Sequence, residues 1–163
     1  MLGLTSLGIF HTAISLVAVA AGLVALVRDR RITWSNRIGK VYVAMTVLTC
    51  VTSLGIFQHG GFGKPHVLAI ITLAVIGLAL AAGSTALFGR ASRYVETVSY
   101  SATFLFHLIP GITESTTRLP PGAPLLANAD APALQTATAV LLVLFLAGAT
   151  LQVLQMRSGR AAR

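Results

Sequence analysis

Five segments of this chain are runs of mainly apolar residues, and polar connectors separate them. The runs cover residues 7–27, 38–57, 66–87, 94–113 and 136–154. A helix needs about 20 mostly apolar residues to cross a hydrocarbon core of about 30 Å. The connector at residues 115–135 is longer than the others and rich in proline, which is typical of an extended loop. The pattern predicts an all-α integral membrane bundle of about five transmembrane helices in a single domain, residues 1–163.

Composition supports this interpretation. Apolar residues make up 55% of the chain and charged residues only 10%, and the mean hydropathy is +0.83, a balance that soluble domains do not reach. The sequence contains no glycine-rich phosphate loop, nucleophile elbow or metalloprotease pattern. A soluble enzyme is therefore excluded, and the sequence leaves open whether the membrane protein is an enzyme.

Basic residues follow the first, third and fifth runs. Ten of the twelve Lys and Arg lie there: Arg28, Arg30, Arg31, Arg37, Lys40, Arg90, Arg93, Arg157, Arg160 and Arg163. The positive-inside rule then places the amino terminus outside, the carboxyl terminus in the cytoplasm and residues 115–135 on the extracytoplasmic side. The net charge of +8 lies in short turns without an aromatic platform for bases, so we expect contacts with anionic lipid headgroups and no binding of nucleic acid.

The fourth run carries a polar stripe. Residues spaced by three or four fall on one helical face, and here they are Arg93, Glu96, Tyr100, Thr103, His107, Pro110, Glu114 and Thr117. An ionisable side chain at the centre of a bilayer costs about 2.5–3.5 kcal/mol on insertion scales. The stripe is therefore expected to face the interior of the bundle.

The first two runs carry matching stripes at the same spacing. In the first run they are Gly8, His11, Ser15, Ala18, Gly22 and Ala25, and in the second Gly39, Tyr42, Thr46, Thr49 and Ser53. Small residues allow helices to approach closely in lipid. We expect a compact bundle with a narrow, polar interior, and the small-residue grooves also permit self-association.

Histidines gather in the half of the predicted bundle opposite the basic residues. At about 1.5 Å of rise per residue, His11 lies about 6 Å and His107 about 10 Å below the outer boundary. His66 is expected at that boundary, and His59 lies just outside it. Glu114 belongs to the same half. Pro110 leaves the carbonyl of Phe106 without a helical donor, so we also expect the helix to bend there and the ring N–H of His107 to bond to that carbonyl.

Three chemistries fit such a group. His11 and His107 can be the axial pair of a b-type haem, with small residues around His11 giving room for the porphyrin edge. His11, His66 and His107 with Glu114 can hold Zn²⁺ or Cu²⁺. Tyr100, His107 and Glu114 can hydrogen-bond a quinone head group or transfer protons.

The leading hypothesis is a small protein of the bacterial inner membrane that binds haem b or a metal and serves electron transfer, or supports a larger respiratory or photosynthetic complex as one of its subunits. Its partners are then the lipid bilayer and other membrane subunits. The alternative is an accessory subunit without a cofactor, in which the polar stripe is an interhelical hydrogen-bond network. A small transporter or channel is the third hypothesis.

The stretch NRIGKVYVAMTVLTCVTSLGIF at residues 36–57, followed by GGFGKPHVLAIITLAVIGLALAAG at 60–83, resembles a family of predicted multi-pass bacterial membrane proteins classed as a domain of unknown function. In that family a His or Asn, then Arg, an aliphatic residue, Gly and a basic residue open a helix, as residues 36–40 do here. The resemblance covers residues 10–120 and implies a membrane fold without an activity. In outline the chain is also similar to small b-type cytochromes of the cytochrome b561 kind.

Overall fold

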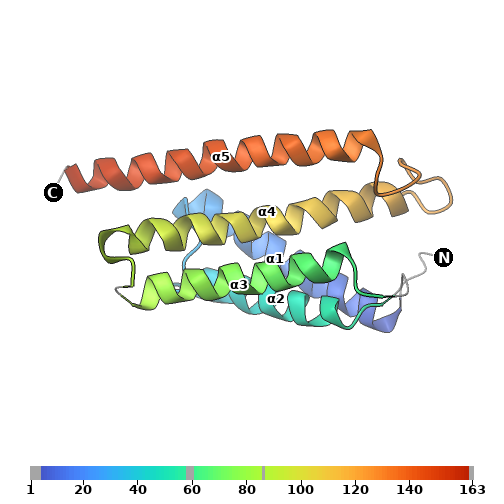
Figure 1. The fold of residues 1–163 in the computed structure, drawn as a ribbon, viewed down its shortest axis with the longest axis horizontal. Coiled ribbons are helices and arrows are strands. Elements are labelled where there is room, and N and C mark those ends of the chain that lie inside the picture. The colour runs from blue at the N-terminus through green and yellow to red at the C-terminus, as the bar shows by residue number, and fades with distance from the viewer. Residues whose placement is uncertain (1–4, 58–60, 86, 162–163) are drawn as a thin grey trace.

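A computed structural model shows an all-α bundle (Figure 1). It describes residues 5–57, 61–85 and 87–161, with side chains up to 158. Within that part, five α-helices and one 3₁₀ turn follow one another: α1 (Ser6–Asp29), α2 (Arg37–Leu54), α3 (Lys64–Ser84), η1 (Gly89–Ala91), α4 (Ser92–Arg118) and α5 (Pro132–Ala161). Four of them, α1, α2, α3 and α5, are long and apolar enough to cross a membrane.

Helix boundaries follow from local capping. The Asn36 side chain accepts a hydrogen bond from the amide of Gly39 at 2.8 Å and so caps the start of α2. Its amide group also donates to Asp29 Oδ2, at the end of α1, at 3.0 Å. A Cβ atom on Gly39 would collide with the backbone carbonyl of Thr33. The Asn-x-x-Gly pattern at residues 36–39 therefore closes the tight connection between α1 and α2.

The helices run alternately up and down, so the two termini lie at opposite ends of the bundle (Figure 1). One end holds the α1–α2 and α3–α4 connections and the last turn of α5. We call it the basic end, because Arg30 and Arg31 in the first of these connections, Arg90 in the second and Arg157 near the end of α5 lie there. The opposite end holds the start of α1 and the α2–α3 and α4–α5 connections, and we call it the histidine end.

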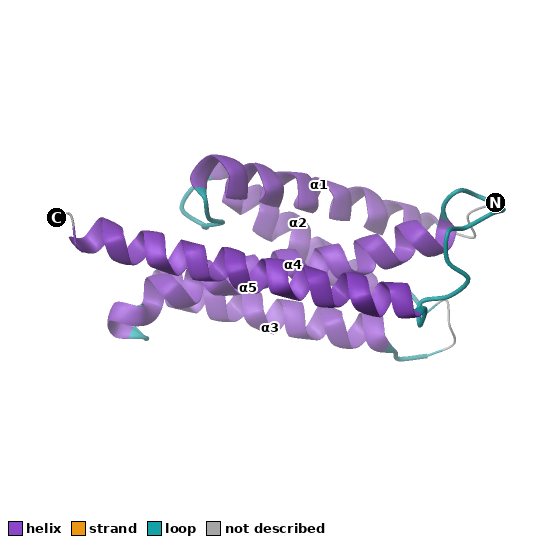
Figure 2. Cartoon of the chain, turned by 90° about the horizontal axis from the view of Figure 1, so that it is seen from above, coloured by secondary structure: helices purple, strands orange, loops and turns teal. Residues whose placement is uncertain are grey.

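α4 is the central element of the bundle. It packs against α1, α3 and α5, whereas α5 packs against no helix but α4 in the described part of the chain. Figure 1 shows α5 running along α4, and in Figure 2 α5 crosses in front of α4. The core between α1, α2, α3 and α4 contains Tyr42 and Tyr100, both fully buried, among small and branched apolar side chains. Any side chain that α4 turns toward this core is therefore shielded by three other helices.

The proline-rich loop that was expected at residues 115–135 is shorter at both ends in the structure. α4 continues through Arg118, and α5 already begins at Pro132, which leaves 119–131 as the connection. Threonine hydroxyls in the last turns of α4 donate to helix carbonyls, for example Thr117 to Thr113 at 2.7 Å, and so satisfy acceptors at the helix end. Pro132 lacks an amide hydrogen, which costs nothing at the first position of a helix.

Other boundaries also differ from the apolar runs, and α3, for example, ends at Ser84 rather than at residue 87. α2 ends at Leu54, three residues before the expected end of its run, and α5 extends to Ala161, beyond residue 154. Pro110 lies inside α4 without ending it. Hydropathy marks where a helix is apolar, whereas caps and hydrogen bonds decide where it stops.

Candidate functional site

The middle of the polar stripe of α4 faces the interior, as its spacing predicts, whereas Pro110 and Glu114 further along the stripe are exposed. Tyr100 and Thr103 have no exposed surface, and His107 is 8% exposed. Thr97, Ser99 and Ser101 are buried as well, so most of the buried residues of α4 are polar. The buried side of this helix is thus its hydrophilic side, which is the arrangement expected for a helix surrounded by apolar helices in a lipid environment.

His107 is held by α2. Its Nε2 atom lies 3.0 Å from the Thr46 hydroxyl oxygen. That hydroxyl already donates its single hydrogen to the Tyr42 carbonyl at 2.7 Å, so the network requires His107 Nε2–H to be the donor. Neutral His107 then keeps its lone pair on Nδ1. The carbonyl of Phe106 was expected to be the partner of His107, and the structure shows Thr46 instead, because the two side chains reach each other across the interior of the bundle.

His11 makes an equivalent contact nearer the histidine end. Its Nδ1 atom lies 2.9 Å from the Thr52 hydroxyl oxygen, and that hydroxyl donates to the Leu48 carbonyl at 2.9 Å. By the same reasoning His11 donates from Nδ1 and keeps a lone pair on Nε2. Both histidines are therefore oriented by threonines of α2.

A second hydrogen-bonded group continues from His107 toward the basic end. The Tyr42 hydroxyl lies 2.8 Å from the Thr103 hydroxyl, and Thr103 donates its hydrogen to the Tyr100 carbonyl at 2.8 Å. Tyr42 is therefore the donor of this pair. The Tyr100 hydroxyl, one turn along α4, is buried and has no hydrogen-bond partner among the described residues. A buried hydroxyl without a hydrogen-bond partner lowers the free energy of unfolding by about 1–3 kcal/mol.

Glu114 and Glu96 mark the two ends of the stripe. Glu114 forms an ion pair with Arg118 one turn away, and its side chain is 56% exposed. Glu96 accepts a hydrogen bond from Thr33 at 3.0 Å, and its carboxylate packs against Gly83, where a Cβ atom would lie only 2.8 Å from the carboxyl carbon. Gly83 on α3 thus makes room for an acidic side chain at the basic end.

His66 belongs to a different environment. It is 4% exposed and lies between Phe57 and Phe62, with ring centroids 4.8 and 5.2 Å away. Its Nδ1 accepts a hydrogen bond from the Gly63 amide at 3.2 Å, which caps the first turn of α3. Its Nε2 is buried and has no hydrogen-bond partner within the part of the chain that the structure describes. His59 lies outside the described residues.

Among the described residues, no group of three or more His, Cys, Asp or Glu side chains is arranged to hold a metal ion. The expected set of His11, His66, His107 and Glu114 is thus not assembled as one ligand cluster. Cys50 is a buried free thiol. A metal or haem could engage the lone pairs of His11 Nε2 and His107 Nδ1 singly or as a pair.

The small-residue groove of α1 is filled by protein side chains further along the helix. A Cβ atom on Gly22 would lie 2.7 Å from the Phe104 ring and 2.9 Å from the Tyr42 ring. At this level the groove accepts aromatic rings from α4 and α2, which leaves no room for a porphyrin edge beside Gly22. Any cofactor on the two histidines must therefore lie closer to the histidine end.

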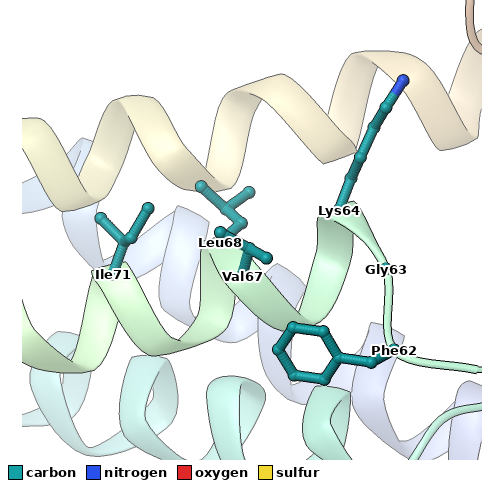
Figure 3. A pocket seen from close by; sticks show the side chains of 6 residues that line it. All are labelled: Phe62, Gly63, Lys64, Val67, Leu68 and Ile71. Atoms are coloured by element: carbon teal, nitrogen blue, oxygen red, sulfur yellow. The ribbon is translucent and has the colours of Figure 1, made fainter.

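Two shallow grooves lie on the outside of the bundle. One, of about 500 Å³, is lined by Phe62, Gly63, Lys64, Val67, Leu68 and Ile71. Figure 3 shows that the Lys64 side chain extends away from α3 at the end of this groove, and its ammonium group pairs with Asp130 of the α4–α5 connection at 3.0 Å. The other, of about 540 Å³, lies on α5 along Val143, Leu146, Ala147, Thr150 and Leu151.

Sequence reasoning missed the partners of the histidines. Thr46 and Tyr42 were placed on an inward stripe of α2 by their spacing, but nothing in the spacing showed that they meet His107 and Thr103. Thr52 and Thr33 were not identified at all. In the sequence, each of these residues is recognisable only as a hydroxyl side chain in or beside a predicted helix, and such hydroxyls are possible partners for an ionisable group on another helix.

The fold defines a class, an all-α bundle in which four helices can span a membrane and a fifth, polar helix lies between them. Comparison of the chain with protein-family models, curated proteins and solved structures found no match. Its function is therefore inferred from its own geometry.

Proposed function

We propose that this chain is a five-span protein of the bacterial inner membrane, with its amino terminus outside and its carboxyl terminus in the cytoplasm. The alternation of the helices supports this orientation, because it brings the α1–α2 connection, the α3–α4 connection and the last turns of α5 to one end of the bundle (Figure 1), and these segments carry Arg30, Arg90 and Arg157. Cytoplasmic loops carry an excess of Lys and Arg. The basic end then faces the cytoplasm, and the histidine end faces outward.

α4 is the fifth span in this proposal. Its 27 residues extend about 40 Å at 1.5 Å per residue, enough to cross a bilayer. Two of its inward polar side chains, His107 and Thr103, are hydrogen-bonded to Thr46 and Tyr42 of α2. Insertion of so polar a helix requires its neighbours, which the packing of α1 and α3 against it supplies.

Within the membrane we propose that the protein is an accessory subunit that docks through α5 onto another membrane protein. The observation that carries this proposal is the small share of α5 residues that are buried by the other helices. In its most apolar window only 6% of the residues are buried, against 28–33% in α1, α2 and α3. The α5 groove along Val143 to Leu151 lies on the exposed side, and a partner helix fits such a groove by packing its side chains between these residues.

Site-specific photo-crosslinking in native membranes tests the docking. A photoreactive residue replaces Val143 on α5 or, as a matched control, Leu23 on α1, which are 64% and 54% exposed. We expect a discrete protein adduct from position 143 and none from position 23. An adduct of twice the mass of the chain would make the partner a second copy. Absence of any protein adduct at position 143 would show that lipid alone covers α5 and would overturn the proposal.

A second candidate, binding of haem b or of Zn or Cu for electron transfer, is favoured by the free lone pairs of His11 and His107. Each ring is oriented by a threonine through its other nitrogen, as metal-binding histidines commonly are by an outer partner. The test is an oxidised-minus-reduced visible spectrum with elemental analysis of the gently purified protein. A b-type signal lost in both His11→Ala and His107→Ala would establish haem, and a spectrum without it, with no stoichiometric metal, would remove this candidate.

A further inference from the structure

The exposed face of α2 changes from basic to apolar along its length. The exposed residues of this helix, in order from the basic end, are Arg37, Lys40, Val41, Ala44, Leu48 and Val51. Their spacing places them on one side of the helix, opposite the buried side that carries Tyr42 and Thr46. In the described part of the chain no other helix covers this face, and in a membrane it is therefore open to lipid.

The two cations of this face have no acidic partner among the described residues. Asp29, at the end of α1, binds Arg28 through both carboxylate oxygens at 2.8 Å and also accepts a hydrogen bond from Asn36 at 3.0 Å. Arg37 and Lys40 take part in no ion pair of the described residues. Both lie in the first turn of α2, where the helix dipole disfavours a positive charge and favours a negative one. An anion from outside the chain would therefore offset two charges that the fold leaves uncompensated.

Trp34 lies beside the basic part of this face. The Lys40 Nζ atom is 6.0 Å from the centroid of the Trp34 ring, and the tryptophan is 44% exposed. A cation over the face of an indole ring is attracted to it, and tryptophan is enriched at the level of the lipid headgroups. The contact therefore orients Lys40 and marks the level at which headgroups lie along α2.

The apolar part of the face matches one lipid leaflet in length. At about 1.5 Å per residue, about 16 Å of helix separates Arg37 from Leu48, which is about half of a hydrocarbon core of about 30 Å. A phospholipid carries its phosphate at one end and its acyl chains below it, in the same order as the basic and apolar residues of α2. A free phosphate ion would use only the basic part of this face.

We propose that α2 carries a binding site for one anionic phospholipid, with the phosphate on Arg37 and Lys40 and an acyl chain along the helix as far as Leu48. The site rests on the proposed insertion of the bundle in a membrane, and it adds a defined lipid position to that proposal. It differs from a general attraction between basic residues and lipid, because Arg28 belongs to the same end of the bundle but is already paired with Asp29.

The experiment uses Trp34, the only tryptophan of the chain, as the reporter. The purified full chain is reconstituted into phosphatidylcholine vesicles that contain an increasing share of phosphatidylglycerol brominated in the upper part of its acyl chains, because bromine quenches tryptophan fluorescence at short range. A parallel series contains brominated phosphatidylcholine. Each Lys or Arg near an anionic lipid strengthens binding about fivefold, so we expect phosphatidylglycerol to bind beside Trp34 about tenfold more strongly than phosphatidylcholine.

Two arginines of the basic end supply the matched variants. Arg37→Gln should lower the preference for phosphatidylglycerol about fivefold. Arg157→Gln removes the same charge from an exposed position at the same end, but on α5, which packs against α4, and should leave the preference unchanged. Because both side chains are exposed, both variants should unfold at the wild-type temperature.

The outcomes separate this site from the membrane proposal on which it rests. Equal quenching by the two brominated lipids, or an equal loss of preference in Arg37→Gln and Arg157→Gln, would overturn the lipid site and leave insertion in the membrane intact. Absence of quenching by either lipid would place Trp34 away from the bilayer and would overturn both.

Discussion

α4 and α5 are neighbours of similar length, 27 and 30 residues, yet they have opposite characters. α4 buries seven residues, of which six are polar, and α5 exposes a long row of leucines and valines. Hydropathy identifies α5 as a membrane span and does not identify α4. The difference teaches that, between these two helices, the apolar side chains are the ones exposed on the outside of the bundle, whereas the polar side chains are the ones enclosed by other helices.

A larger side chain on α1, at the position that packs against α4, should destabilise the bundle more than any other change. Gly22→Leu would force a side chain into the rings of Phe104 and Tyr42, and overpacking of this kind costs about 1–3 kcal/mol or more. Gly148→Leu on α5 meets nothing within 4 Å and should gain up to about 1 kcal/mol from helix propensity. SDS titration of the protein in mild-detergent micelles measures the free energy of unfolding of the two variants. Equal losses of stability would contradict the expected difference between α4 and α5.

The His107–Thr46 hydrogen bond should have the next largest effect. Interhelical hydrogen bonds in membrane proteins contribute about 0.6 kcal/mol on average, up to about 1.7, and this buried one should lie near the upper value. A double-mutant cycle of His107→Ala and Thr46→Ala measures it as a coupling energy. Thr150→Ala on α5 serves as the control, and its coupling to His107→Ala should be zero within error. A coupling near zero for Thr46 would show that the contact does not form.

Gln152 connects α5 to the rest of the bundle. Its side chain accepts from Ser101 at 2.9 Å and donates to the Arg30 carbonyl at 2.9 Å. Gln152→Ala should cost about 1 kcal/mol and raise hydrogen exchange in α5 while α1 to α3 stay protected. The exposed Gln155 is the control, because Gln155→Ala should leave exchange unchanged. Increased hydrogen exchange in all helices would mean that α5 unfolds together with the rest of the bundle.

The ion pair between Lys64 and Asp130 should have the smallest effect. The two side chains are 92% and 78% exposed, and such surface pairs contribute about 0–1 kcal/mol. Asp130→Asn should lower stability by less than about 0.5 kcal/mol at low salt, and the difference should vanish at high salt. A loss above about 1 kcal/mol would show that the α4–α5 connection is held more tightly than its exposure indicates.

Much of the fold could be predicted from residue spacing. The stripe on α4 correctly placed Tyr100, Thr103 and His107 in the interior, because a helical period converts spacing into a face. The loop ends at Arg118 and Pro132 were misjudged, because proline and polar residues are common at helix ends as well as in loops. The partners of His11 and His107 could not be predicted, since spacing along one helix carries no information about the register of the next.

The sequence by itself determined the helices, their alternating order and the clustering of basic residues at one end, because these depend on apolar length, helical period and position along the chain. Only the tertiary structure decided that Thr46 and Thr52 pair with His107 and His11, and that Phe104 and Tyr42 fill the groove at Gly22. These contacts join residues that are far apart in sequence, and they are set by the rotation and depth at which whole helices pack.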